Sequence, residues 1–102
     1  MIRHIVLANL RSDLPPADKE SLFTALAGMK AHIPGIVAVT AGTNNSPEGL
    51  DRHHDLGLTV DFVDAAARDA YLPHPHHVSV AKQLLGATQG GVDGILVLDY
   101  EI

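Results

Sequence analysis

Several residue types are missing or scarce in this chain of 102 residues, and each absence removes a class of function. There is no cysteine, which excludes disulfides, thiolate metal sites and a cysteine nucleophile. There is no tryptophan and there are only two tyrosines and two phenylalanines, too few for a platform that stacks single-stranded nucleic acid. Seven Lys and Arg stand against twelve Asp and Glu, and the resulting net charge of −5 disfavours any nucleic-acid partner.

Long apolar runs are also missing. The opening MIRHIVLANL is interrupted by Arg3 and His4, and no small-residue cleavage site follows it. We therefore expect no membrane partner. The lack of cysteine fits a reducing compartment, so we expect a cytoplasmic protein. The length is that of one domain, residues 1–102, with enough chain to bury a core.

What is present is a clear alternation of apolar patterns. Helical spacing of apolar residues predicts a helix that begins near Pro16 and ends before Pro34. The helix-forming stretch DAAARDAYL predicts a short helix capped by Asp64 and continuing through Tyr71, and a further helix is expected over Val78–Leu85. β-branched runs and period-two alternation predict four strands: Ile2–Leu10, Ile36–Thr43, His54–Phe62 and Val92–Tyr100.

The order of these elements is βαββαβ, with the second helix broken in two. This order predicts an α+β, ferredoxin-like fold in which helices cover one face of a four-stranded antiparallel sheet. The first and last strands are apolar on both faces, as Ile95 and Val97 alternate with Leu96 and Leu98. Helices can cover only one face, so we expect a second copy of the sheet to cover the other.

The stretch YLPHPHHVSV, residues 71–80, concentrates three of the seven histidines. A zinc site would need three or four ligands that converge. Pro75 suits a first helical turn, and neighbouring helical positions point about 100° apart, so His76 and His77 diverge. Only His53 and His54 could help from elsewhere, and we therefore predict no metal site.

Acid–base chemistry needs less: one histidine in a dry pocket and one partner. The helix break can fold Tyr71 and His77 toward the sheet, where the hydroxyl polarises a carbonyl and the imidazole moves a proton. The alternative is that His77 only packs or caps. His4, in an apolar strand, is either a hydrogen-bonded core residue or part of the pocket. His74 is either a cap or loop contact or a substrate-binding residue.

Other polar residues give weaker indications of a functional role. His76 is expected to face solvent, and His32 to complement a helix dipole. The loops NNSPEG and GATQGG lack the residues of a phosphate-binding loop and read as turns. Asp99 and Glu101, near the sheet edge, are expected to be solvated or to contact a second subunit, not to catalyse.

Four local patterns carry a resemblance to a known family: the opening MIRHIVL, the loop NNSPEG, the stretch YLPHPHH and the closing VLDYEI. With the βαββαβ order, they make the whole chain similar to the stress-responsive dimeric α/β-barrel family, often called Dabb. The resemblance implies a homodimer whose two sheets face each other as a barrel. It also implies a divided function, since some members are stress-induced proteins without an agreed activity and others are cofactor-free enzymes.

Among those enzymes are a plant polyketide cyclase and bacterial lyases of aromatic degradation. The cyclase pattern implies a catalytic histidine at His77, its tyrosine at Tyr71 and a pocket histidine at His4. A second strand histidine of that cyclase falls near Leu56, which is apolar here. The resemblance as a whole leads us to expect a cofactor-free lyase or cyclase for a small aromatic or polyketide-like molecule. His77 and Tyr71 are then expected as catalytic residues, and His4 and His74 as substrate-binding residues. The alternative is a non-catalytic stress-responsive dimer or a protein that binds a small hydrophobic ligand.

Overall fold

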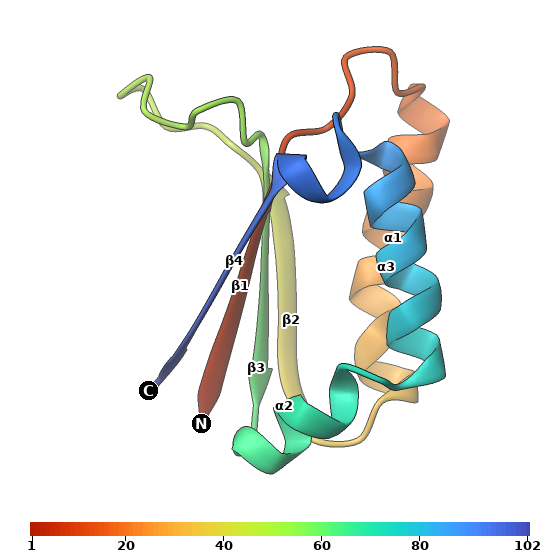
Figure 1. Cartoon of the computed structure of the whole chain (residues 1–102), viewed down its shortest axis with the longest axis vertical. Coiled ribbons are helices and arrows are strands. Elements are labelled where there is room, and N and C mark those ends of the chain that lie inside the picture. The colour runs from red at the N-terminus through yellow and green to blue at the C-terminus, as the bar shows by residue number, and fades with distance from the viewer.

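The computed structural model describes all residues from 1 to 102 and has two layers, a sheet and a helical layer on one of its faces (Figure 1). The four antiparallel strands lie in the order β2-β3-β1-β4. This is the predicted α+β, ferredoxin-like fold. The elements are β1 (Ile2–Ala8), α1 (Pro16–His32), β2 (Ile36–Thr43), β3 (Leu56–Phe62), α2 (Ala65–Tyr71), α3 (Pro75–Ala87), the short 3-10 helix η1 (Gly91–Gly94) and β4 (Ile95–Glu101).

Two strands are shorter than predicted. The strand expected over Ile2–Leu10 ends at Ala8, and Leu10 makes only an isolated bridge. The strand expected over His54–Phe62 begins at Leu56. There the preceding Arg52 and His53 adopt positive φ angles of 51° and 68°, which curl the chain into a turn before the strand starts.

Two further boundaries are corrected by turn and cap chemistry. The helix expected over Val78–Leu85 spans Pro75–Ala87, because Pro75 needs no hydrogen-bond partner at the first helical position. The strand expected from Val92 begins at Ile95, because residues 91–94 form the η1 turn. None of the helices is both long and apolar enough to cross a membrane.

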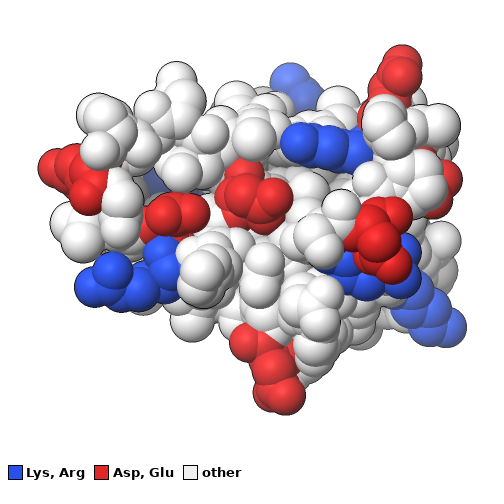
Figure 2. Space-filling model, turned by 90° about the horizontal axis from the view of Figure 1, so that it is seen from above, with Lys and Arg blue, Asp and Glu red and all other residues white.

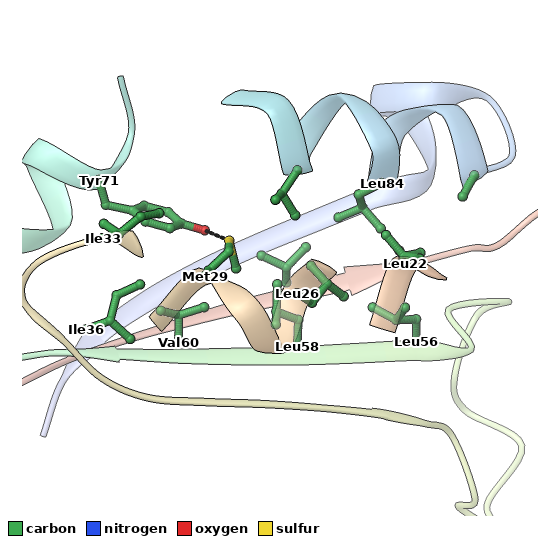
Figure 3. Packing of buried hydrophobic residues seen from close by; sticks show 14 of the residues in the cluster. Leu22, Leu26, Met29, Ile33, Ile36, Leu56, Leu58, Val60, Tyr71 and Leu84 are labelled. Carbon is green, nitrogen blue, oxygen red and sulfur yellow. Dashed lines mark hydrogen bonds between the residues drawn. The ribbon is translucent and has the colours of Figure 1, made fainter. Parts of the chain in front are cut away.

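The core lies between the sheet and the helices (Figure 3). Residues two apart on β1 and β3 point to this side, as the burial of every second residue shows. The predicted stripe of α1 packs on them, so that the apolar pattern of the helix and that of the strands meet. Seven large side chains are almost fully buried there: Tyr71, Phe62, Leu22, Leu26, Met29, Leu56 and Val60.

The opposite face of the sheet is uncovered and largely apolar over β4 and the adjoining part of β1, with the Arg3–Asp61 ion pair at one end. On β4, Leu96, Leu98 and Tyr100 are 55%, 63% and 45% exposed. Leu7, on the neighbouring strand of the same face, is also exposed. Charged residues do not gather in a basic patch on the face seen in Figure 2, where acidic and basic side chains are interspersed. Because these apolar side chains of β4 and β1 are exposed, the single chain leaves a hydrophobic sheet surface open.

Candidate active site

A cavity of about 220 Å³ lies between the sheet and the helices. Its walls are apolar except for two histidines and one tyrosine, and they carry no lysine, arginine or carboxylate. The structure thus brings together His4, Tyr71 and His77, three of the four predicted site residues. The remaining wall residues are Val6, Leu26, Met29, Leu58, Leu72, Val80, Ala81, Leu84, Leu85, Ile95 and Val97.

A larger hollow of about 560 Å³ lies on the other face of the sheet, under the loop between β2 and β3. Thr40 and Thr59 form part of its floor, and Arg52 and His54 lie at its side. It contains none of the four predicted site residues. Its floor belongs to the open sheet surface, so it is less suited to exclude water from a reaction.

His77 lies in the first turn of α3 and is half-buried. Its Nδ1 is 2.9 Å from the backbone oxygen of Leu72. A carbonyl oxygen only accepts, so Nδ1 carries the hydrogen and Nε2 keeps its lone pair when the ring is neutral. Burial lowers the pKa of His77, and the hydrogen bond to Leu72 opposes this only in part. The neutral form of His77 is therefore favoured in the folded chain.

Tyr71 is the last residue of α2 and is 2% exposed. Its ring lies against His77, with the ring centres 3.9 Å apart. The hydroxyl points to the sulfur of Met29 at 3.9 Å, a weak acceptor (Figure 3). Burial, aided by the negative charge of Asp99, raises the pKa of Tyr71 well above its usual range. The hydroxyl thus stays protonated and lacks a strong partner, which leaves it free to donate to a ligand.

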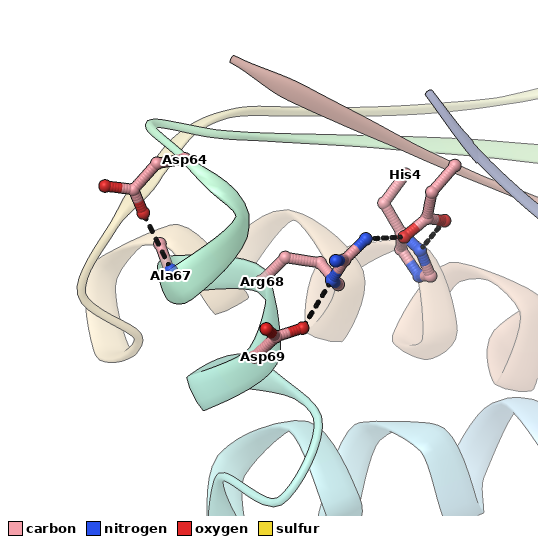
Figure 4. Close-up of polar contacts among 6 residues, drawn as sticks. His4, Asp64, Ala67, Arg68 and Asp69 are labelled. Carbon is pink, nitrogen blue, oxygen red and sulfur yellow. Dashed lines mark hydrogen bonds and ion pairs between the residues drawn. The ribbon is translucent and has the colours of Figure 1, made fainter. Parts of the chain in front are cut away.

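His4 is buried on β1, 5% exposed, and its ring meets the ring of Tyr71 edge to face at 5.7 Å. Its Nδ1 lies 2.6 Å from Oδ1 of Asp99, directly across the β1–β4 pair. Oδ2 of the same carboxylate accepts a hydrogen bond of 2.9 Å from Arg68 on α2. Figure 4 shows His4 and Arg68 in this arrangement, with Arg68 also bonded to Asp69.

Asp99, expected to be solvated or to contact a second subunit, is bonded within the chain and only partly exposed to solvent. Its side chain is 22% exposed and uses both oxygens within the chain. Partial burial works to raise the pKa of Asp99, but the hydrogen bonds from His4 and Arg68 outweigh it and hold the pKa below its usual value. Asp99 and Arg68 are functional candidates that sequence reasoning missed. They lie 95 and 64 residues from His4, so no local spacing could connect them.

The other histidines lie outside the cavity. His74, a predicted substrate-binding residue, is the N-cap of α3, where its Nδ1 accepts from the backbone N–H of His76 at 3.1 Å. It is not among the residues that line the cavity. His76 stacks on the exposed His32, with ring centres 4.3 Å apart. No group of three or more His, Asp or Glu side chains is placed to hold a metal ion.

The fold and cavity define a ferredoxin-like domain with a histidine-lined apolar site. A family model described as "Stress responsive A/B Barrel Domain" (Dabb) matches residues 2–102. The chain belongs to this family, as its four sequence patterns predicted. No curated protein matches this chain.

Solved structures agree with the fold over nearly the whole chain. A dimeric ferredoxin-like protein of unknown function from Jannaschia sp. CCS1 is 29% identical, with a TM-score of 0.88 over 99% of this chain and 98% of that chain. A hydroxynitrile lyase from Passiflora edulis is 22% identical, with a TM-score of 0.85 over 99% and 92%. SnoaB, a cofactor-independent oxygenase from Streptomyces nogalater solved as a variant, is 20% identical, with a TM-score of 0.72 over 99% and 91%.

Proposed function

We propose that this protein is a cofactor-free lyase or cyclase that acts on a small aromatic or polyketide-like molecule by acid–base catalysis. One observation carries this proposal. A buried tyrosine hydroxyl without a strong partner lies beside a histidine whose Nδ1 is tied to a backbone carbonyl, and both line an apolar cavity. Buried polar groups normally have good hydrogen-bond partners, so a donor bonded only to a thioether sulfur at a cavity wall suits the acceptor of a ligand.

His77 is the proposed base and Tyr71 its partner. Nε2 of His77 takes a proton from a carbon next to a carbonyl, while the Tyr71 hydroxyl donates a hydrogen bond to the oxygen that becomes negative. In ring closure, the freed electron pair forms a carbon–carbon bond to a second carbonyl, whose oxygen then takes the proton. In elimination, the pair forms a double bond and the leaving group departs with the proton. Neither route requires a cofactor.

The cavity limits the proposed substrate by size and charge. A volume of about 220 Å³ is below the range of drug-sized sites and suits a molecule of roughly one ring. The walls carry no cationic side chain that would neutralise a carboxylate or phosphate. A neutral ring compound with one or two carbonyl or hydroxyl groups fits these walls, with His4 as a substrate-binding residue.

Related proteins support this reading without deciding the reaction. One structural neighbour is named a hydroxynitrile lyase and another a cofactor-independent oxygenase. Both names describe chemistry on small organic molecules, and both proteins are less than 25% identical to this chain. The choice between cyclisation and elimination is therefore left to experiment.

We also propose a homodimer formed through the open sheet faces. Exposed apolar side chains of β4 and β1 supply the surface, and the related protein from Jannaschia is described as dimeric. Burying them against a second sheet removes from water the apolar area that one chain leaves exposed. The larger hollow under the β2–β3 loop lies on the same face, so the partner would cover it too.

The test is turnover of a panel of neutral aromatic and polyketide-like carbonyl compounds. His77→Ala should lower kcat by about 10²–10⁴-fold, the usual contribution of general acid–base catalysis. Tyr71→Phe should lower it by less, because the ring still packs while the hydroxyl is lost. His76→Ala is the matched control, since His76 is on the same helical turn but outside the cavity.

Ligand binding without turnover would favour the alternative, a binding protein or non-catalytic stress-responsive dimer. Binding is measured by calorimetry with the same compounds. If a substrate is found and His77→Ala turns it over at the wild-type rate, the proposed base is wrong.

Chelator treatment should change neither activity nor Tm, because we expect no metal site. Removal of a metal that binds the folded protein would lower Tm, since such a metal adds to the stability of the fold.

A further inference from the structure

Three side chains link α2 to β1 across the end of β4. His4 and Asp99 face each other in the β1–β4 register, with Nδ1 of His4 at 2.6 Å from Oδ1 of Asp99. Arg68 reaches from α2 and places Nη1 at 2.9 Å from Oδ2 of Asp99. Each oxygen of the carboxylate therefore has its own donor, and the carboxylate is held from two sides.

This arrangement determines where the proton of His4 lies. A carboxylate flanked by a guanidinium is ionised and can only accept, so the hydrogen of His4 must be on Nδ1. Nε2 then keeps the lone pair on a ring that lines the cavity. We propose that Arg68 is a positioning residue that, through Asp99, fixes the proton of His4 on Nδ1 and makes Nε2 of His4 a second base beside Tyr71. The catalytic part of this inference rests on the proposed function, whereas the protonation of His4 does not.

The groups around His4 support this assignment. Asp99 faces it from β4, Arg68 and Tyr71 from α2, and His77 from α3. β3 and α1 line the cavity only with apolar side chains, namely Leu58, Leu26 and Met29. The ring of Phe62, also on β3, lies 6.3 Å from that of His4, centre to centre. Asp99 is therefore the one negative charge that holds His4, and Arg68 is the one fixed positive charge that shares it.

The pairing of Arg68 with Asp69 does not account for the inward contact. Asp69 faces solvent on α2, with its side chain 67% exposed. Its 2.8 Å bond to Nε of Arg68 is a contact between neighbouring residues of one helical turn. The Asp99 contact uses a different nitrogen of the guanidinium, and both partners are mostly buried. Arg68 is thus anchored at the surface by one carboxylate and directed at the cavity wall by the other.

The experiment is NMR of the full chain with ¹⁵N-labelled histidine, which reports the tautomer of each ring. In the wild type, His4 should carry its proton on Nδ1. Arg68→Met keeps the length of the side chain and removes the hydrogen bond to Oδ2 of Asp99, so the carboxylate is held from one side only and part of the His4 population should carry its hydrogen on Nε2. Arg68→Lys should restore part of the difference. Lys30→Gln, an equal charge loss on the exposed side of α1, should leave His4 unchanged.

Two results would overturn the inference. One is a wild-type His4 protonated on Nε2, and the other is an Arg68→Met variant in which all of His4 keeps the wild-type tautomer. If Arg68→Met does not fold, Arg68→Lys provides the decision, because loss of the second guanidinium nitrogen should still move the His4 signal. With a substrate in hand, Arg68→Met should lower kcat while KM stays close to the wild-type value. Correct NMR shifts without any activity would refute the proposed function and leave the positioning role standing.

Discussion

At the scale of the residue, the protonation of His77 connects burial with function. Its pKa is lowered in the folded chain, chiefly by burial, so the neutral form that acts as a base persists below the ordinary histidine pKa of 6.5. The acidic limb of the rate profile is therefore expected below pH 6.5. An acidic limb above that value would contradict the assignment of His77 as base.

The same shift predicts a pH dependence of stability. Below pH 6.5 the unfolded chain takes up a proton at His77 before the folded chain does, so this residue destabilises the fold as pH falls from 6.5 toward the folded pKa. Above pH 6.5 both states are neutral and the effect disappears. His77→Ala should therefore lose less Tm than the wild type on acidification from about pH 7.5 to about pH 5.5. An equal loss in both proteins would contradict the lowered pKa.

Two glycines give a matched pair of backbone predictions. Gly35 has φ of +87°, and an added Cβ would lie 2.5 Å from Cβ of Ala67. Gly35→Ala should cost more than about 1 kcal/mol, from both left-handed strain and the clash. Gly28, inside α1, has open space around it, so Gly28→Ala should stabilise by about 0.5–1 kcal/mol. Urea unfolding measures the free energy of unfolding of both variants. A change of the same sign in the two variants would contradict this account.

At the scale of the element, the broken second helix positions the proposed catalytic pair. Tyr71 ends α2 and His77 stands in the first turn of α3, so the break turns both rings toward the cavity. His74 caps the second half by accepting from the backbone N–H of His76. The cap therefore fixes the direction in which α3 starts and, with it, the position of His77.

His74→Ala should lower the free energy of unfolding by about 1 kcal/mol, the usual cost of removing a capping side chain. His74→Asn should recover most of that loss, because its side-chain oxygen also accepts. Urea unfolding measures the change, and His76→Ala is the control on the same turn. If His74→Asn is as unstable as His74→Ala, the histidine ring contributes something other than the cap.

At the scale of the whole molecule, the sheet is covered on one face only. A mass of about twice the chain mass of 10.8 kDa is expected by light scattering at micromolar concentration. Leu98→Asp places a charge in the centre of the exposed face and should yield monomer or insoluble protein. Val63→Asp, at an exposed valine after β3, should keep the wild-type mass. A wild-type monomer would refute the sheet-to-sheet dimer.

The element order, the fold class and the family were predictable from the sequence. Apolar periods of two and of 3.6 residues are local signals, so the stripe of α1 and the alternation of β3 could be read directly. The ends of elements were less predictable. The positive φ angles at Arg52 and His53, and the η1 turn before β4, depend on how the chain closes around them.

The candidate site divides in the same way. The sequence by itself brought Tyr71 and His77 together, because only one helix break separates them and a proline marks it. It also identified His4 as unusual, since a histidine in an apolar strand needs a partner. It could not supply that partner. Only the tertiary structure decided that Asp99 faces His4 and that Arg68 holds the other carboxylate oxygen, because strand register and helix packing join residues from opposite ends of the chain.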